Sequence, residues 1–186
     1  MGRLLDADAS VLAVIDVQDG FLRKLPEEEA AQLVDRIAWL CRLAGRLGVP
    51  VVVTEEAPER NGETAPSIRE ALPPGTVRHP KPVFDLSACR PILEDVARHG
   101  RGTVVLCGLE TDVCVAQSAL GLLDRGRRVA VVEDAVASPG AAHAQGLARM
   151  SGAGVELVGL KGLAYEWART VERSQELSDP PAGILL

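Results

Sequence analysis

Near-continuous apolar runs alternate with amphipathic segments along this chain. Such runs are typical of parallel strands that are covered on both faces of a sheet. They predict strands at residues 11–17, 49–54, 103–106, 128–134 and 155–158. The clearest helical pattern runs from Pro26 to Leu47, with glutamates in its first turn and apolar residues at helical spacing. Further helices are expected at residues 67–72, 88–99, 112–126, 143–151 and 162–174.

This alternation of strands and helices predicts an α/β fold, a single doubly wound, Rossmann-like domain. We expect a mostly parallel six-stranded sheet in the order 3-2-1-4-5-6, with helices on both faces. The 186 residues suffice for one domain with a substantial core. The domain is expected to span residues 1–174. Prolines and Gly183 mark residues 175–186 as a tail that is either frayed or docked on a partner subunit.

Composition narrows the classes of partner. The net charge of −6 disfavours a partner with a phosphate backbone, and an aromatic content of 3% leaves few stacking platforms, so we expect no nucleic acid. No run is long and apolar enough for a membrane span, and the N-terminus lacks the apolar segment of a signal peptide. We therefore expect a cytoplasmic protein without a membrane partner. The four cysteines have no disulfide-framework or zinc spacing, so reduced thiols are expected.

One of these cysteines, Cys114, lies where a strand is expected to turn into a helix. An apolar run leads into Cys107–Val115, and a helical pattern begins near Asp112. The first turn of a helix carries unpaired N–H groups and partial positive charge, which favour a thiolate and lower the pKa of a cysteine. This stretch alone is equally consistent with Cys114 being a small hydrophobic residue that is buried in the core.

Topology connects Cys114 with Asp16. A carboxylate near the end of a buried strand is costly unless it is paired or functional, and we favour a functional role for Asp16 over capping of the loop that follows. In the expected strand order, the strands before these two residues are neighbours at the switch point where ligands bind. This convergence favours a nucleophilic Cys114 over core packing. Lys81 lies between two prolines that stiffen its backbone, although spacing alone favours an ordinary surface lysine.

The motifs of the chain resemble the isochorismatase-like cysteine hydrolases, a superfamily that includes nicotinamidases, carbamoylsarcosine amidohydrolase and isochorismatase. The resemblance covers roughly residues 10–170. The matching segments are Val14–Gln18 with Phe21, Lys81 with Phe84, Cys107–Val115, and Val131–Ala135 with Ser138.

This resemblance implies a catalytic triad, with Cys114 as nucleophile, Asp16 as general base and Lys81 as their electrostatic partner. The implied reaction is hydrolysis of the C–N bond of a small amide, ureide or carbamoyl compound through an acyl-thioester on Cys114. The resemblance also implies a cis peptide bond between Leu109 and Glu110. The backbone N–H groups of Glu110 and Cys114 would then form the oxyanion hole.

The same resemblance assigns Gln18 and Phe21 to substrate binding. Nicotinamidases hold a metal through an aspartate and histidines in the loop after the second strand, but residues 55–75 contain no histidine. We therefore predict no metal or other cofactor, a position in the metal-free branch of unassigned substrate, and little nicotinamidase activity. Isochorismatase itself lacks a cysteine at this position, which argues against cleavage of a vinyl ether.

A second hypothesis is a catalytically idle protein that keeps the isochorismatase fold for binding or assembly. The intact set of Asp16, Lys81 and Cys114 favours the enzyme. Three acidic residues expected at the mouth of the cleft, Glu55, Glu56 and Glu59, would discourage anionic substrates. The resemblance further implies a homo-oligomer, a dimer or larger, for which the last helix and the apolar residues 184–186 offer surface.

Overall fold

A six-stranded parallel sheet forms the centre of the computed structural model, which describes residues 2–184. Its strand order is β3-β2-β1-β4-β5-β6, and every neighbouring pair of strands is parallel. This confirms the predicted doubly wound α/β fold. The strands are β1 (Ser10–Ile15), β2 (Val51–Glu56), β3 (Arg78–Lys81), β4 (Thr103–Leu109), β5 (Arg128–Ala137) and β6 (Glu156–Val158).

The edge strand β3 is the one strand that no apolar run marks. It pairs with β2 alone, in a register that places Arg78 beside Val53 and Lys81 beside Glu56. Pro80 lies within it and cannot donate to a ladder, which an edge strand tolerates. The short polar strand thus carries Lys81 to the carboxyl end of the sheet.

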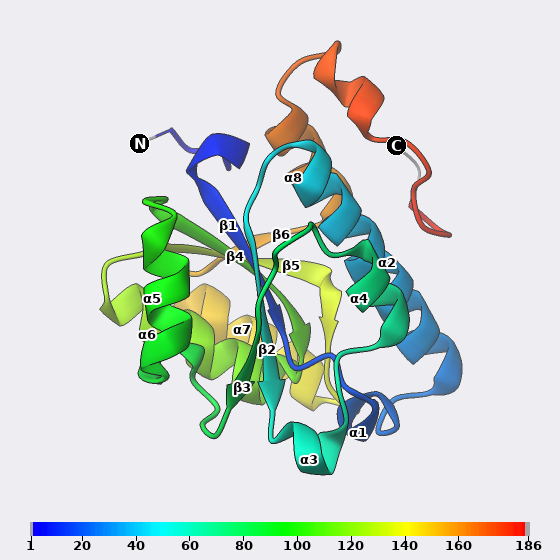
Figure 1. Ribbon diagram of the computed structural model, residues 1–186, viewed down its shortest axis with the longest axis vertical. Helices are drawn as coiled ribbons and strands as arrows, with labels where there is room; N and C mark the ends of the chain where they lie inside the picture. The colour runs from blue at the N-terminus through cyan, green and yellow to red at the C-terminus, as the bar shows by residue number, and fades with distance from the viewer. Residues whose placement is uncertain (1, 185–186) are drawn as a thin grey trace.

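Helices cover both faces of the sheet (Figure 1). Buried side chains of α2, α4 and α8 pack with one face, and those of α5, α6 and α7 pack with the other. The short helices α1 and α3 contact each other near the carboxyl ends of β1 and β2. The helices are α1 (Asp19–Leu22), α2 (Glu27–Arg46), α3 (Pro58–Asn61), α4 (Pro66–Ala71), α5 (Arg90–Arg98), α6 (Ala116–Asp124), α7 (Ala142–Gly152) and α8 (Leu160–Ala168). Within residues 2–184, no helix has the length and apolar character to cross a bilayer.

The central strand β1 explains why its sequence is continuously apolar. Leu12 and Val14 belong to the core beneath α2 and α8, whereas Val11, Ala13 and Ile15 belong to the core beneath α5, α6 and α7. All five side chains are fully buried. A strand that is covered on both faces has no polar side, so its pattern does not alternate.

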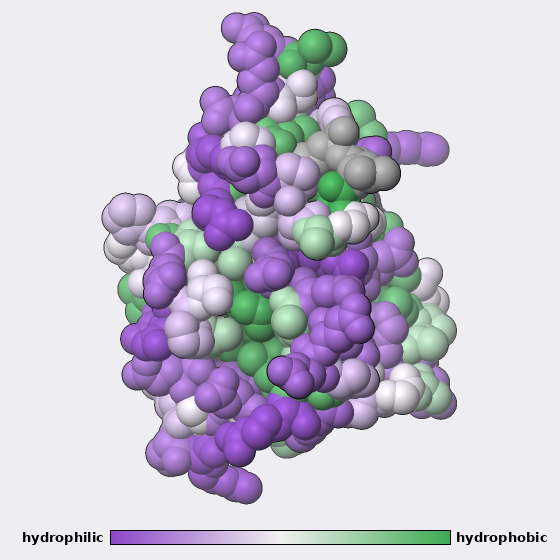
Figure 2. Space-filling model, turned by 90° about the vertical axis from the view of Figure 1, so that its right-hand side faces the viewer, coloured by the Kyte–Doolittle hydropathy of each residue, from purple (hydrophilic) through white to green (hydrophobic). Residues whose placement is uncertain are grey.

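The C-terminal segment lies along α2 of the same chain. The helix predicted at 162–174 ends early, at Ala168, and a short 3-10 turn (Arg173–Glu176) follows it. Beyond this turn, the Trp39 indole N–H donates to the Ser178 carbonyl at 2.9 Å, and Leu177 is buried. Residues 185–186, part of the predicted apolar end, lie outside the described residues. Polar side chains predominate on the face of the molecule that carries α2 and α4 (Figure 2).

Candidate active site

A buried carboxylate, Asp16, follows directly after β1. The Asp16 backbone has a φ of 50°, in the left-handed region that non-glycine residues seldom adopt. Its N–H donates to the Thr54 carbonyl at 3.1 Å, and the Thr54 hydroxyl donates to Asp16 Oδ1 at 2.7 Å. The other carboxylate oxygen, Oδ2, lies 2.8 Å from Lys81 Nζ. Contacts from β2 and β3 therefore hold the two oxygens of Asp16.

Lys81 is not the surface lysine that its spacing alone suggested. Its side chain is fully buried, like that of Asp16. Besides the ion pair with Asp16, Nζ donates to the carbonyls of Val83 at 2.8 Å and Phe84 at 3.1 Å. These three partners match the three donors of an ammonium group. The loop after β3 thus holds Lys81 in one position against Asp16.

Cys114 lies in a π-helical turn, Thr111–Val115, that precedes α6. The thiol is 2% exposed, and its sulfur lies 3.2 Å from Glu56 Oε2. The Cys114 sulfur and one carboxylate oxygen from each of Asp16 and Glu56 all lie within 4.8 Å of one another. The structure therefore brings together the three residues of the expected triad and adds Glu56 to them.

The expected lowering of the Cys114 pKa is wrong. Burial raises the pKa of the Cys114 thiol and the nearby Asp16 carboxylate raises it further, while the Lys81 ammonium acts in the opposite direction. Hydrogen bonds to Asp16 and Glu56 also stabilise the protonated thiol. Desolvation and the two carboxylates thus outweigh the one ammonium. A thiol with a raised pKa is protonated at neutral pH, so its ionisation would require a proton acceptor.

Asp16 is placed to be that base. Burial raises the pKa of its carboxyl, and the charge of Lys81 together with hydrogen bonds from Lys81, Thr54 and Cys114 offsets part of this effect. A carboxylate in contact with a thiol, with a pKa above its usual range, is a better proton acceptor than an exposed aspartate.

Ser138, which follows β5, and residues of α7 anchor the turn that carries Cys114. The Ser138 hydroxyl donates to Asp112 Oδ1 at 2.6 Å, and Thr111 Oγ1 lies 3.0 Å from His143 Nδ1. A Cβ at Gly146 would lie 2.8 Å from the Asp112 backbone, so a side chain there would displace the turn. His143 and Gly146 were missed in the sequence because nothing in its pattern connects α7 with this turn.

Comparison with known proteins identifies the family. Residues 10–161 match the model of the isochorismatase domain. The chain belongs to the isochorismatase family. Isochorismatase domain-containing protein 2 of Bos taurus is 34% identical over 196 residues, covering 100% of this chain and 91% of that protein.

Solved structures have the same isochorismatase fold. The MAR1 ribonuclease from Caenorhabditis elegans has a TM-score of 0.86 and 27% identity, covering 99% of this chain and 98% of that one. The YcaC gene product from Escherichia coli, described as an octameric hydrolase of unknown specificity, has a TM-score of 0.88 and 25% identity, covering 95% and 88%. The protein therefore has an isochorismatase-family hydrolase fold.

Within this isochorismatase fold, the peptide bond between Leu109 and Glu110 is cis. The Glu110 carbonyl accepts hydrogen bonds from the N–H groups of Val113 at 3.2 Å and Val115 at 3.1 Å. The Glu110 side chain pairs with Lys24 at 3.0 Å. Glu110 therefore connects the end of β4 with the turn that carries Cys114.

The isochorismatase resemblance assigned Gln18 and Phe21 to substrate binding, and the structure shows which groups they contact. Gln18 is fully buried. Its amide donates to the carbonyls of Glu56 at 3.1 Å and Gly62 at 2.5 Å, and it accepts from the Glu56 N–H at 2.7 Å. Phe21 is buried in the core, with Lys24 Nζ 4.8 Å from its ring centre. Gln18 therefore fixes the backbone of Glu56, and contact of either residue with substrate stays a prediction.

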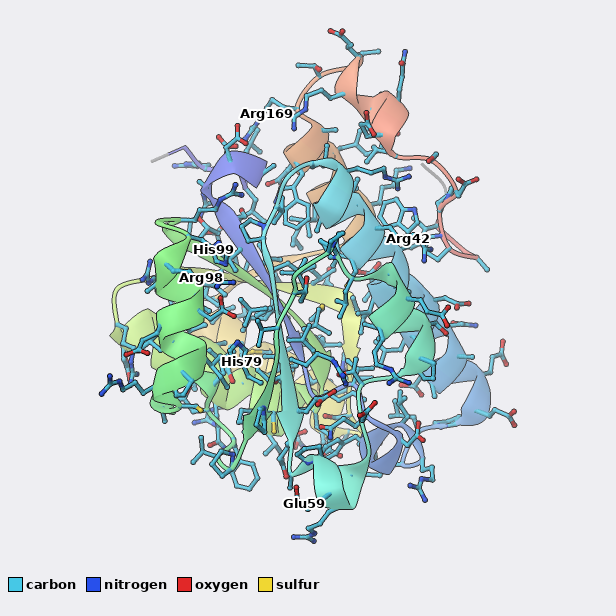
Figure 3. The ribbon with its side chains drawn as sticks, in the orientation of Figure 1. Arg42, Glu59, His79, Arg98, His99 and Arg169 are labelled. Carbon is cyan, nitrogen blue, oxygen red and sulfur yellow. The ribbon has the colours of Figure 1, made fainter. Side chains whose placement is uncertain are left out.

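The three glutamates expected at the mouth of the cleft have three different environments. Glu55 is buried and accepts from the Thr64 N–H and hydroxyl at 2.8 and 2.7 Å, and from Arg78 at 2.9 Å. Glu59 is exposed on α3 and points away from the sheet (Figure 3). Glu56 alone of the three contacts the Cys114 sulfur.

Replacing Glu55 with glutamine is expected to lower the free energy of unfolding at pH 7 by about 2 kcal/mol. Burial alone would raise the pKa of Glu55, but the Thr64 and Arg78 contacts together hold it below its ordinary value of 4.5. A carboxylate with a lowered pKa stabilises the fold above its unfolded-state pKa, and this contribution is lost as the pH falls through the folded-state pKa. Urea unfolding at pH 7 and near pH 3 should show a smaller pH dependence for Glu55→Gln. If Glu55→Gln and the parent protein showed the same pH dependence of stability, the lowered pKa of Glu55 would be contradicted.

A metal would compete with Lys81 in this site. Among residues 2–184, the group of Asp16, Glu56 and Cys114 has the spacing to ligate an ion. The Lys81 ammonium, however, lies 2.8 Å from Asp16 Oδ2 and supplies the positive charge that an ion would bring. His79 is engaged elsewhere, since its Nε2 lies 2.5 Å from Asp95 on the side of β3 that faces α5 (Figure 3). The donor set thus does not fit the aspartate–histidine pattern of nicotinamidases, and metal independence stays a prediction.

Proposed function

We propose that this isochorismatase-family protein hydrolyses the C–N bond of a small amide, ureide or carbamoyl compound through an acyl-thioester on Cys114. One observation carries the proposal: a buried Asp16–Lys81 ion pair lies beside the Cys114 thiol, at the carboxyl ends of β1 and β4. A nucleophile, a base and a group that fixes the base are the parts that cysteine-dependent acyl transfer needs.

The reaction begins with a neutral thiol. As the Cys114 sulfur attacks the carbonyl carbon, Asp16 takes the S–H proton, and the carbonyl π electrons move to oxygen. Backbone N–H groups of Glu110 and Cys114 donate to this oxyanion. When the C=O bond re-forms, the C–N bond breaks, and Asp16 returns the proton to the leaving nitrogen. Water then attacks the thioester, Asp16 takes its proton, and the sulfur leaves and is reprotonated.

Replacing Lys81 with methionine is expected to move the acid limb of the pH–kcat/KM profile to higher pH. Lys81 lowers the pKa of Asp16, so its loss raises that pKa further, and a base works only when deprotonated. The variant should also lose about 3 kcal/mol of stability, because it leaves a buried carboxylate unpaired. The matched control is Lys161→Met, an exposed residue of α8. An acid limb that does not move would contradict the role of Lys81.

Ammonia release from a panel of small primary amides, ureides and carbamoyl compounds tests the proposed function. Turnover of at least one compound is expected from the parent protein and from Cys89→Ala, a cysteine at the start of α5. Cys114→Ala should be inactive toward the same compound. Absence of turnover across the panel would favour the idle binding or assembly protein.

The comparisons also bear on the partners that we propose. A homo-oligomer is supported by the E. coli relative, which is described as octameric. The C. elegans relative is named a ribonuclease, but the net charge of −6 of this chain disfavours a nucleic-acid substrate. A small molecule therefore remains the proposed substrate.

A further inference from the structure

We propose that Glu56 determines specificity, selecting substrates whose group next to the scissile carbonyl is cationic or donates N–H hydrogen bonds, and rejecting those with a carboxylate there. This inference rests on the proposed function, because it assumes that Cys114 is the nucleophile. The observation that carries it is the 3.2 Å contact between Glu56 Oε2 and the Cys114 sulfur.

Glu56 is held in place by its main chain. Its N–H donates to Gln18 Oε1 at 2.7 Å, and its carbonyl accepts from Gln18 Nε2 at 3.1 Å and from Asn61 Nδ2 at 2.8 Å. It is also the last residue of β2, paired in register with Lys81. The carboxylate therefore extends from a fixed backbone toward the sulfur, and a substitution of the side chain leaves these contacts intact.

Two carboxylates and one ammonium group lie around the Cys114 thiol. The Asp16 carboxylate has its counter-ion, Lys81, at 2.8 Å. Among residues 2–184, no cationic side chain forms an ion pair with Glu56. With a neutral thiol, the group of Asp16, Lys81 and Glu56 carries one net negative charge on the Glu56 side of the sulfur.

Attack by the Cys114 sulfur brings the electrophilic carbon, and the groups attached to it, next to Glu56. An amide or ureide NH₂ can donate to a carboxylate, and an ammonium or amidinium group can pair with it. An ester oxygen offers no donor, and a carboxylate would meet a like charge in a poorly solvated place. The substrate class that fits is therefore a neutral or cationic amide or ureide with free N–H groups beside the carbonyl.

Charge-matched alkylation of Cys114 tests this without any knowledge of the substrate. The reagents are bromoacetamide, bromoacetate and 2-bromoethylammonium; in each reaction an S–C bond forms, bromide leaves and the thiol proton passes to Asp16 or solvent. Rates are measured in a Cys89→Ala background, by mass spectrometry of the Cys114 peptide, and are divided by those of 2-mercaptoethanol. The parent should favour the cation over the anion, and Glu56→Gln should reduce that ratio roughly tenfold or more.

The control is Glu59→Gln, which removes an exposed glutamate from α3, three residues after Glu56, and should leave the ratio unchanged. Glu56→Ser is a second variant with the same expected result, should the glutamine variant fold poorly. If Cys114 reacts but Glu56→Gln stays within twofold of Glu59→Gln, the role of Glu56 is overturned and the proposed function stands. If Cys114 resists all three reagents in the parent protein, both fail.

Discussion

Cys114→Ala is expected to lower kcat/KM for C–N hydrolysis by about 10⁴-fold or more, the size of loss that follows removal of a nucleophile acting with its base. Cys41 and Cys107 are fully buried in the core on the α2 side of the sheet, and Cys89 lies at the N-cap of α5. None of these cysteines is therefore placed to replace Cys114. The measurement is ammonia release at several substrate concentrations, with Cys89→Ala as the matched variant.

If Cys114→Ala still hydrolysed the substrate, the reaction would have to follow a different mechanism. If this variant keeps a tenth or more of the parent rate, Asp16 must activate water for direct attack on the substrate. The thioester would then play no part in the reaction, although Asp16 and Lys81 would keep their positions.

Asp16→Asn is expected to change two properties of the site in opposite directions. Hydrolysis should fall by about 10³-fold, because the variant lacks the base that takes the thiol proton. The pKa of Cys114 should fall as well, because the Asp16 charge raises it in the parent and Lys81 would remain without its counter-ion. Alkylation of Cys114 by bromoacetamide near pH 8 should therefore become faster while hydrolysis is lost.

Lost hydrolysis combined with a lowered Cys114 pKa would show that Asp16 acts on the reaction and not by keeping the thiol ionised. A pH series of alkylation rates in the Cys89→Ala background shows whether the Cys114 pKa is lower in Asp16→Asn than in the parent. The matched control is Asp35→Asn, an exposed residue of α2, which should change neither property. Hydrolysis by Asp16→Asn at a tenth or more of the parent rate would contradict the role of Asp16 as base.

The sequence predicts those parts of the fold that burial determines. β1 and β4 were found because a strand covered on both faces is continuously apolar, and α2 because one face of it is apolar. β3 was missed because a four-residue edge strand with a single partner needs no apolar side chains. The end of the last helix was misplaced because the polar residues after Ala168 still permit a helical pattern.

The residues of the candidate site were likewise predictable only where strand order or burial determines their position. Strand order alone places Asp16 and Cys114 side by side, whereas Lys81 was indicated only by the family resemblance, since its burial depends on the carbonyls of the loop after β3. The direction of the Cys114 pKa shift could not be predicted, because it depends on burial and on carboxylates from two other strands. The contact of Glu56 with the sulfur likewise depends on how Gln18 fixes the end of β2.

Detection of the acyl group on Cys114 during turnover tests the central claim most directly. A compound hydrolysed in the panel is mixed with the enzyme and quenched in acid during steady state, and the intact mass and the Cys114 peptide are then measured. The account predicts an added mass equal to the acyl part of the substrate, located on Cys114, removed by hydroxylamine and absent from Cys114→Ala. Rapid turnover with an unmodified Cys114 under conditions that preserve a thioester standard, or an acyl group on another residue, would contradict it.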